Sequence, residues 1–260
     1  MSHEWAKANK LTQEALDYVD AQASRIRQLE RLLAAGAGSI RLMTLAPELP
    51  GALELVKQLA RAGVVASIGH TSATDAEVRE AVRAGATAAT HAFNAMPPFH
   101  HRKPGAVGAV LDLQEVSCEL ICDGFHVDPV AMRLLYRAKG ALGTRLVTDA
   151  MAAAGMPDGE YRLCGRPVTV TGGRAVLADG ESIAGSTLTM EAAVQNAVRF
   201  LGVPIAEAVL ISSTNSARLL GLHGRKGAIA AGLDADLLVL NELLAVEATM
   251  VAGRWLAGPP

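Results

Sequence analysis

The sequence predicts an α/β fold in which a parallel sheet forms part of a β/α barrel. Short apolar runs, typical of buried strands, alternate with segments of helical periodicity. A helical connection between successive strands makes those strands parallel. Histidine or aspartate residues follow the C-terminal ends of several strands, and in a barrel these ends converge on one mouth. With 50% hydrophobic and 19% charged residues, the chain can build a core and is not of the disordered class.

Five apolar runs predict the strands of this sheet. They cover residues 40–45, 64–70, 87–91, 116–122 and 145–149. His70, His91 and Asp149 are the last residues of their runs, and His126 comes shortly after the fourth run. An open sheet would spread these side chains along one edge, whereas a barrel would gather them, which favours the barrel.

Helical periodicity fills the segments between the strands. The expected helices cover residues 11–35, 52–62, 74–85, a segment beginning at 128, and 188–201, 205–211 and 215–220. Thr74 and Glu77 form a capping-box pattern, and Pro129 after Asp128 is typical of a first helical position.

Two further segments predict β-structure outside the sheet. Residues 160–179 hold two short extended runs with turn glycines, which predicts a hairpin-like insertion. Residues 226–240 and 248–255 also have strand character. We therefore expect a barrel domain over residues 1–222, including the helix at 11–35 and the insertion, and a C-terminal β segment over residues 223–260.

Composition narrows the class of partner. A net charge of −2, no polybasic run and only nine aromatic residues argue against nucleic acid and a lipid surface. No apolar run reaches the ~18 residues of a spanning helix, and we see no signal peptide. The three cysteines, Cys118, Cys122 and Cys164, fit reduced thiols better than a disulfide framework. We expect a cytoplasmic protein that acts on a small molecule.

His70 and His91 are candidate metal ligands. They lie 21 residues apart, one β/α unit, and neutral imidazoles on adjacent strand ends can share a zinc ion at ~2.1 Å each. A single histidine at a strand end is more often a structural residue. Two in succession, followed by a third and by an aspartate, favour a metal site.

Asp149 is the candidate acid/base. A carboxylate beside a metal-activated water accepts its proton and can pass it to a leaving nitrogen. The alternative is an aspartate that caps the following segment. His126 could polarise a substrate carbonyl as a hydrogen-bond donor, and its alternative is a packing role.

Two loops could contact an anionic substrate. Backbone amides near Asn94 and Ala95, with the cation of Arg102, would suit a phosphate group, although a solvated basic loop explains the same residues. Gly185 and Ser186, which follow Ile183 and Ala184, are expected to open a helix, where free amides could meet a ligand or could belong to an ordinary N-cap.

Seven stretches together resemble the N-acetylglucosamine-6-phosphate deacetylase family of the amidohydrolase superfamily. In family order they are Thr44–Glu48, Ser67–Thr71, Thr90–Pro97, Arg102–Gly105, Asp123–Val127, Val147–Met151 and Ala184–Met190. The set is highly specific. The stretch from Gly227 to Leu240 is less so, because many amidohydrolases end with it.

The resemblance implies a partial (β/α)8 TIM-like barrel of the metal-dependent hydrolase type, in which this chain supplies strands four to eight and lacks the N-terminal part of the family. It implies deacetylation of N-acetyl-D-glucosamine 6-phosphate to D-glucosamine 6-phosphate and acetate in amino-sugar catabolism. It also implies a divalent metal, for which zinc is the default and iron, cobalt or manganese are alternatives.

The resemblance implies roles for the polar strand-end residues. His70 and His91 resemble the two metal-binding histidines, and Asp149 resembles the catalytic acid/base. A family metal-binding glutamate lies in a His-Leu-Glu-Gly-Pro-Phe type motif that we do not find here. Glu4 stands ahead of His70 at about the distance expected for that metal-binding glutamate, and it could be a relic of it.

The resemblance also implies substrate contacts. These are Asn94, Ala95, Arg102, His126, Ile183, Ala184 and Gly185. His126 would contact the substrate near its acetamido group, and Asn94 and Ala95 would lie on the phosphate side. Arg102 resembles a basic residue that reaches the site of a neighbouring subunit, which implies a homodimer.

Two other interpretations remain open. The chain could be a truncated, catalytically impaired fragment or paralogue that at most binds sugar phosphate, which the missing glutamate motif favours. It could instead be another amidohydrolase, of the dihydroorotase or nucleobase deaminase kind. The loop at residues 94–97 together with Arg102 disfavours this last interpretation.

Overall fold

The computed structural model describes residues 24–178, 180 and 182–257, and it divides into two compact units. The first unit comprises the chain up to Ala88 together with Ala95–Ala109. The second comprises Ala89–Asn94 and the chain from Val110 onward. The helix expected at residues 11–35 falls partly outside the described residues, and its described part is a helix over residues 24–36.

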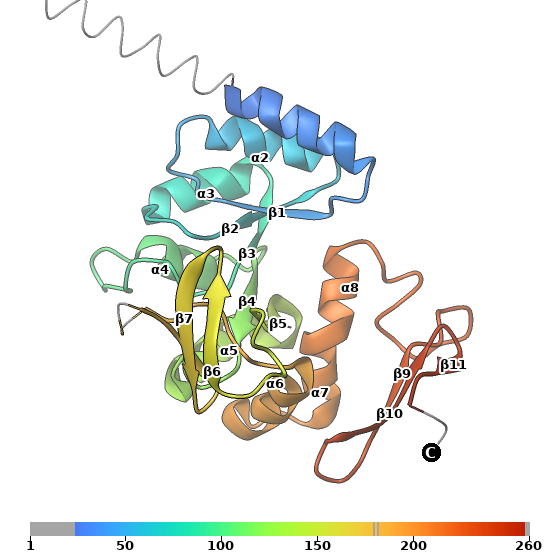
Figure 1. Cartoon of the computed structure of the whole chain (residues 1–260). Helices are drawn as coiled ribbons and strands as arrows, with labels where there is room; N and C mark the ends of the chain where they lie inside the picture. The colour runs from blue at the N-terminus through green and yellow to red at the C-terminus, as the bar shows by residue number, and fades with distance from the viewer. Residues whose placement is uncertain (1–23, 179, 181, 258–260) are drawn as a thin grey trace, which may run out of the picture. The chain divides into compact units, whose positions relative to one another are not determined.

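A parallel sheet of five strands runs through the chain, as predicted (Figure 1). In spatial and sequence order the strands are β1 (Leu42–Leu45), β2 (Val65–Ile68), β3 (Ala86–Ala89), β4 (Ser117–Ile121) and β5 (Thr144–Val147). Leu42 pairs with Val65 in the first strand pair, and Cys118 pairs with Thr144 in the last. Three strands end two residues earlier than predicted, because His70, His91 and Asp149 leave the extended conformation.

The helices of the first unit follow the predicted order. They are the helix at 24–36, α2 (Ala52–Arg61) and α3 (Asp75–Ala84). The predicted capping box is present, because Glu77 N donates to Thr74 Oγ1 at 3.3 Å and Thr74 N donates to Glu77 Oε2 at 2.8 Å. Helix α4 (Gly105–Asp112), which follows the loop after β3 and extends from the first unit into the second, has no counterpart among the helices expected from the sequence.

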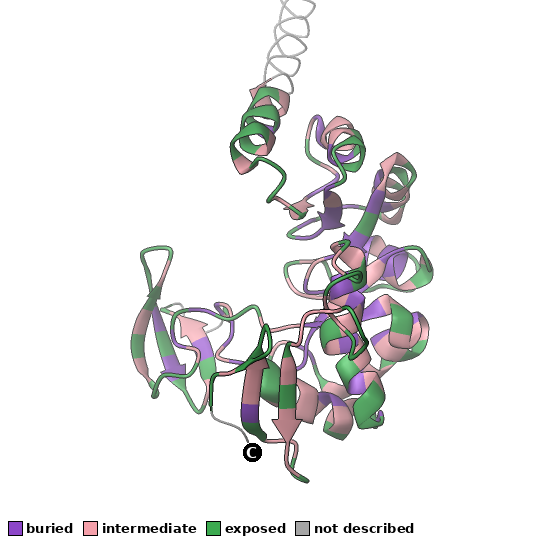
Figure 2. Ribbon diagram, turned by 90° about the vertical axis from the view of Figure 1, so that its right-hand side faces the viewer, coloured by how far each residue is buried: buried purple, intermediate pink, exposed green. Residues whose placement is uncertain are grey.

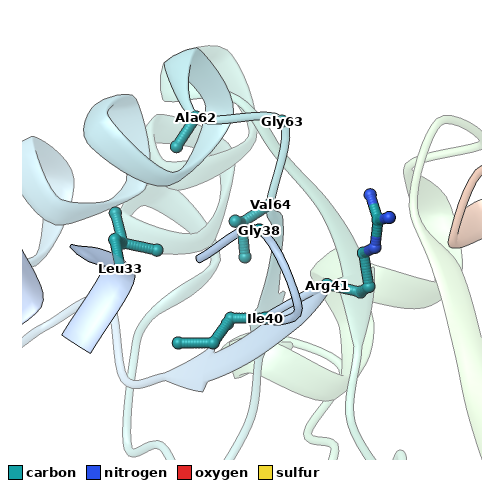
Figure 3. Close-up of a pocket in the computed structure, with 7 residues that line it drawn as sticks. All are labelled: Leu33, Gly38, Ile40, Arg41, Ala62, Gly63 and Val64. Carbon is teal, nitrogen blue, oxygen red and sulfur yellow. The ribbon is translucent and has the colours of Figure 1, made fainter. Parts of the chain in front are cut away.

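A cavity of about 150 Å³ lies in the first unit, where the helix at 24–36 faces the start of β1 and the turn after α2. The apolar side chains of Leu33, Ile40 and Val64 face one another around it (Figure 3). No predicted site residue lines this cavity.

The second unit holds the remaining helices. They are α5 (Pro129–Gly143), α6 (Met190–Asn196), α7 (Ile205–Val209) and α8 (Asn215–Leu219), with π-helical turns η1 (Ala197–Leu201) and η2 (Leu210–Thr214). As predicted, Pro129 opens α5, and Asp128 caps it by accepting from Val130 N at 2.7 Å. The predicted break between 211 and 215 is wrong, because the π-helical turn carries the helix across these residues.

Two small antiparallel sheets complete the second unit. The insertion is a three-stranded meander rather than a hairpin, with strands β6 (Gly159–Leu163), β7 (Arg166–Thr171) and β8 (Arg174–Leu177). The C-terminal sheet comprises β9 (Leu237–Leu240), β10 (Val246–Val251) and β11 (Arg254–Trp255). Strand structure predicted for residues 226–236 is wrong, because Gly227 and Gly232 turn the chain at φ values of 89° and 90°.

Burial follows the parallel sheet and the helices that cover it. Buried residues lie in the strands and on the helix faces beside them, and exposed residues lie on the outer helix faces (Figure 2). All three cysteines are free, and burial raises the pKa of Cys118 to about 11 and that of Cys122 to about 12. In the described ranges, no helix has both the length and the apolar character needed to cross a lipid bilayer.

Asn215 provides a test of this packing. Its buried Nδ2 donates to Ala141 O at 2.7 Å and to Thr144 O at 2.9 Å, where α8 meets the start of β5. We expect Asn215→Ala to lower the free energy of unfolding by about 2–3 kcal/mol, because the carbonyls lose their donor inside the core. Gln114→Ala is the matched control, because its exposed amide also donates to two carbonyls, and it should cost less than about 0.5 kcal/mol. Urea denaturation measures both, and equal losses would contradict the expectation.

Candidate active site

Three predicted site residues that closely follow strands share an unusual backbone conformation, which Ala95 also has, with a φ value of 50°. His70, His91 and Asp149 each lie two residues past the end of a strand, and their φ values are 49°, 30° and 49°. Residues other than glycine rarely adopt positive φ, and such strain concentrates at functional sites. The surrounding structure must hold each of these turns in place.

In the first unit, a carboxylate holds the segment that follows His70. Thr71 Oγ1 donates to Glu48 Oε2 at 2.5 Å, and Ser72 N donates to Glu48 Oε1 at 2.7 Å. Thr71 N also donates to Ala95 O at 3.0 Å. The backbone after the exposed His70 is therefore fixed from two sides.

In the second unit, His91 is 5% exposed and begins a tightly bonded turn. Its backbone N donates to Glu119 Oε2 at 3.2 Å. Asn94 closes the turn, because both its N, at 3.0 Å, and its Nδ2, at 3.1 Å, donate to His91 O. The Asn94 amides expected to face a phosphate thus bind within the turn here, and the anion contact stays a prediction.

Asp149 is exposed at its side chain but fixed at its backbone. Ser186 N donates to Asp149 O at 2.8 Å, and Met151 N donates to Ser186 O at 2.9 Å. Gly185 has φ +63°, and a Cβ there would lie 3.2 Å from Asp149 O and 3.2 Å from Met151 Cβ. The structure thus brings the predicted segment 183–185 directly beside Asp149.

The meander β6–β8 holds residues 183–185 in place beside Asp149. Ala184 N donates to Ala175 O at 3.1 Å, and Ile183 bridges to Val176. Met151 and Ala184 belong to one buried apolar cluster with residues of β7 and β8. The expectation that Gly185–Ser186 opens a helix is wrong, because Ser186 pairs with the Asp149 segment and α6 begins at Met190 with Thr189 as its N-cap.

Asp123, which the sequence analysis did not single out, holds His126. Asp123 Oδ1 accepts from Phe125 N at 2.8 Å and from His126 N at 2.9 Å, while Oδ2 lies 2.6 Å from His126 Nδ1. Burial works to raise the pKa of Asp123, but the hydrogen bonds from His126 and Phe125 outweigh it and lower this pKa. Because Nδ1 faces Asp123, any substrate contact of this ring would use Nε2. The Asp-x-x-His spacing in a turn is the sequence pattern that could have indicated this contact between Asp123 and His126.

The basic loop of the first unit is exposed. Arg102 Nη1 lies 2.8 Å from His101 Nε2, and Arg102 N donates to His100 Nδ1 at 3.2 Å. The His100 and His101 rings stack with centroids 4.5 Å apart. The loop gathers cationic and polar groups, and its contact with an anion remains a prediction.

The donor types suit a divalent metal, because imidazole is a common ligand of zinc and related ions. His70 belongs to the first unit and His91 to the second. Within the described part of the chain, no group of three or more His, Cys, Asp or Glu side chains is placed to hold a metal ion. Glu4 lies outside the described residues.

The sequence profile of the amidohydrolase family matches residues 8–256, so the chain belongs to the amidohydrolase family. Membership implies a divalent metal. The five parallel strands with their helices form part of the TIM-like barrel of this family, and a small C-terminal β segment follows.

Within this family the chain is similar to sugar-phosphate deacetylases, which confirms the resemblance. It is 43% identical over 93% of its length to an N-acetylglucosamine-6-phosphate deacetylase of Lysinibacillus sphaericus. It is 42% identical over 88% of its length to an N-acetylgalactosamine-6-phosphate deacetylase of Escherichia coli O157:H7. It covers 61% and 60% of these relatives.

Solved structures support the same grouping. An N-acetyl-D-glucosamine-6-phosphate deacetylase mutant from Mycobacterium smegmatis, in complex with N-acetyl-D-glucosamine-6-phosphate, matches 88% of this chain with a TM-score of 0.85 and 45% identity. The match covers 61% of that chain. This chain therefore spans about three-fifths of the length of such relatives.

Gly185→Ala tests the close approach to Asp149. We expect it to lower the free energy of unfolding by at least about 1 kcal/mol more than Gly165→Ala, a matched control with φ +80° and nothing within 4 Å of the added Cβ. Both variants place an alanine at positive φ, which lowers stability in each. Only the added Cβ of Gly185→Ala also contacts the Asp149 backbone. Chemical denaturation measures the difference, and equal costs would show that the contact is relaxed.

Asp123→Asn tests the hold on His126. A lowered folded pKa stabilises the fold above the unfolded value of ~3.9, and the benefit is lost as the pH falls through the folded pKa. We therefore expect the variant to be less stable than the parent chain at pH 7, and the gap to narrow below pH ~4. Thermal or urea unfolding between pH 7 and pH 3 measures it. A gap that widens toward low pH would contradict this sign.

Proposed function

We propose that this chain catalyses metal-dependent deacetylation of N-acetyl-D-glucosamine 6-phosphate, which yields D-glucosamine 6-phosphate and acetate in amino-sugar catabolism. The observation that carries the proposal is the 43% identity to an N-acetylglucosamine-6-phosphate deacetylase across 93% of this chain. The segments that bear the candidate residues lie inside that length of chain, and the strand-end turns described above support their roles.

His70 and His91 are the proposed ligands of the divalent metal. They follow β2 and β3, which are neighbours in the sheet order. The metal, when bound, supplies Lewis-acid activation of water and of the amide carbonyl. Zinc is the proposed ion because imidazole donors suit it, with iron, cobalt and manganese as alternatives.

Asp149 is the proposed acid/base. Its exposed carboxylate stands on a backbone fixed by Ser186, so it can take a proton from water and return it to the leaving amine nitrogen. His126, oriented by Asp123, is the proposed donor near the acetamido group. Residues 183–185 are proposed to line the substrate beside Asp149.

The phosphate group is proposed to meet Asn94, Ala95 and Arg102. Arg102 is proposed to act in the site of a second subunit, so the protein would work as a homodimer. A cytoplasmic location follows from this proposed role in the metabolism of a phosphorylated sugar.

Deacetylation of N-acetylgalactosamine 6-phosphate is the second candidate. The 42% identity to the Escherichia coli enzyme of that name is close to the identity with the glucosamine enzymes. The two substrates differ only in the configuration of one hydroxyl group. Impaired catalysis with sugar-phosphate binding alone is the remaining alternative, since the chain spans about three-fifths of these relatives.

Acetate release tests the proposal directly. We expect the purified chain with added zinc to release acetate from N-acetylglucosamine 6-phosphate faster than from the galactosamine epimer. Asp149→Asn should lower the rate about 10²–10⁴-fold, because it removes the proton acceptor and keeps the shape. Coupled enzymatic detection of acetate measures both.

The outcomes separate the candidates. A preference for the epimer would transfer the proposal to the galactosamine substrate. No release by a chain shown to be folded would overturn catalysis, and calorimetric binding of the sugar phosphate would then support the binding-only alternative.

A further inference from the structure

A buried ion pair lies across β4 and β5 in the second unit. Glu119 pairs directly opposite Arg145 in the register, and Arg145 Nη1 lies 3.1 Å from Glu119 Oε1. The side chains are 12% and 5% exposed. The neighbouring Cys118 instead contacts Val110 O of α4, so Glu119 and Arg145 point to the sheet face away from that helix.

Glu119 holds the turn at His91 through two different atoms. Its side-chain Oε2 accepts from His91 N at 3.2 Å, and its backbone O accepts from Ala92 N at 2.9 Å. His91 has φ 30°, so its amide direction differs from that of an extended residue. The Glu119 carboxylate, rather than a backbone carbonyl of the neighbouring strand, accepts this hydrogen bond from His91 N.

Arg145 fixes the carboxylate that performs this task. Besides the ion pair, Arg145 Nε donates to Ser117 Oγ at 3.2 Å. A buried ion pair is a weak source of stability, since an apolar pair of similar volume often does as well. The presence of two charged side chains here is better explained by their effect on the position of His91, because an apolar pair would not accept a hydrogen bond from His91 N.

We infer that Glu119, oriented by Arg145, is a positioning residue that sets the direction of His91 through the His91 backbone amide. The inference rests on the proposed function for the metal role of His91, and it adds two residues that no motif of the resemblance assigns. Residues that hydrogen-bond to a metal ligand, without touching the metal, help to orient that ligand. Their substitution typically weakens metal affinity by 10–100-fold.

Amide hydrogen exchange in the metal-free full chain tests the contact. We expect Glu119→Ala to speed exchange of the His91 amide at least about 10-fold, while the Ala92 amide, bound to the Glu119 backbone, changes little. Glu119→Gln keeps an acceptor oxygen and should restore protection to within about 3-fold of the parent chain. Glu160→Ala is the control, because that carboxylate accepts from Thr169 Oγ1 in the meander at 2.9 Å.

Zinc affinity, measured by competition with a chromogenic chelator, tests the consequence. We expect His91→Ala to weaken zinc binding most, Glu119→Ala by about 10–100-fold, and Glu119→Gln by less. A merely structural role would not produce this order at matched stability.

Each outcome decides between the two claims. Unchanged His91 exchange in Glu119→Ala, or faster exchange throughout the chain in both Glu119 variants, overturns the inference. Zinc binding that depends on His91 but not on Glu119 also overturns it and leaves the proposed function standing. Zinc binding that does not depend on His91 overturns the proposed metal ligand, and the exchange result then decides alone whether Glu119 fixes His91.

Discussion

The candidate site depends on hydrogen bonds that hold non-glycine residues at positive φ just past the strand ends. Past the strand ends, some backbone amides bond to side chains rather than to a neighbouring strand. Glutamate carboxylates take that place twice, with Glu48 bonding the segment after His70 and Glu119 bonding His91 itself. At Asp149 the backbone is held in a different way, because Ser186 N donates to Asp149 O beside the bridge between Ala150 and Ser186. Three different sets of hydrogen bonds therefore fix the backbone just past the end of a parallel strand, from which a candidate side chain extends.

The meander β6–β8 serves the same requirement. Its strands β7 and β8 pack on Met151 and Ala184, which lie near the bridge between Ala150 and Ser186. The strain at Asp149 is thus held by an apolar cluster as well as by hydrogen bonds. An insertion that looks peripheral in sequence supports the proposed acid/base and carries the segment proposed to line the substrate.

Sequence patterns predicted the parts of this protein that depend on local signals. The five strands follow from apolar runs, and the α3 cap follows from the spacing of Thr74 and Glu77. The pairing of Glu119 with Arg145 could not be predicted, because it depends on strand register across 26 residues of sequence. The third strand of the meander was missed, because Gly172 and Gly173 resemble the end of a hairpin as much as its continuation. The candidate residues are predictions from strand-end positions and motifs, whereas the groups bonded to them required the structure.

The division into two units gives one short segment a particular importance. His70, Ala95 and Arg102 belong to the first unit, and His91, Asn94, His126 and Asp149 belong to the second. The chain passes from the first unit to the second after Ala88, returns at Ala95 and passes to the second again after Ala109, so a single turn separates the first two crossings. Asn94 closes that turn onto His91 O, and Ala95 O receives the amide of Thr71 beside His70. The turn at residues 91–95 therefore carries a bond to the His91 backbone in the second unit and a bond to Thr71, the neighbour of His70, in the first. The His91 backbone is bonded at both ends, by Glu119 at its N and by Asn94 at its O, so the turn fixes the backbone from which this imidazole extends.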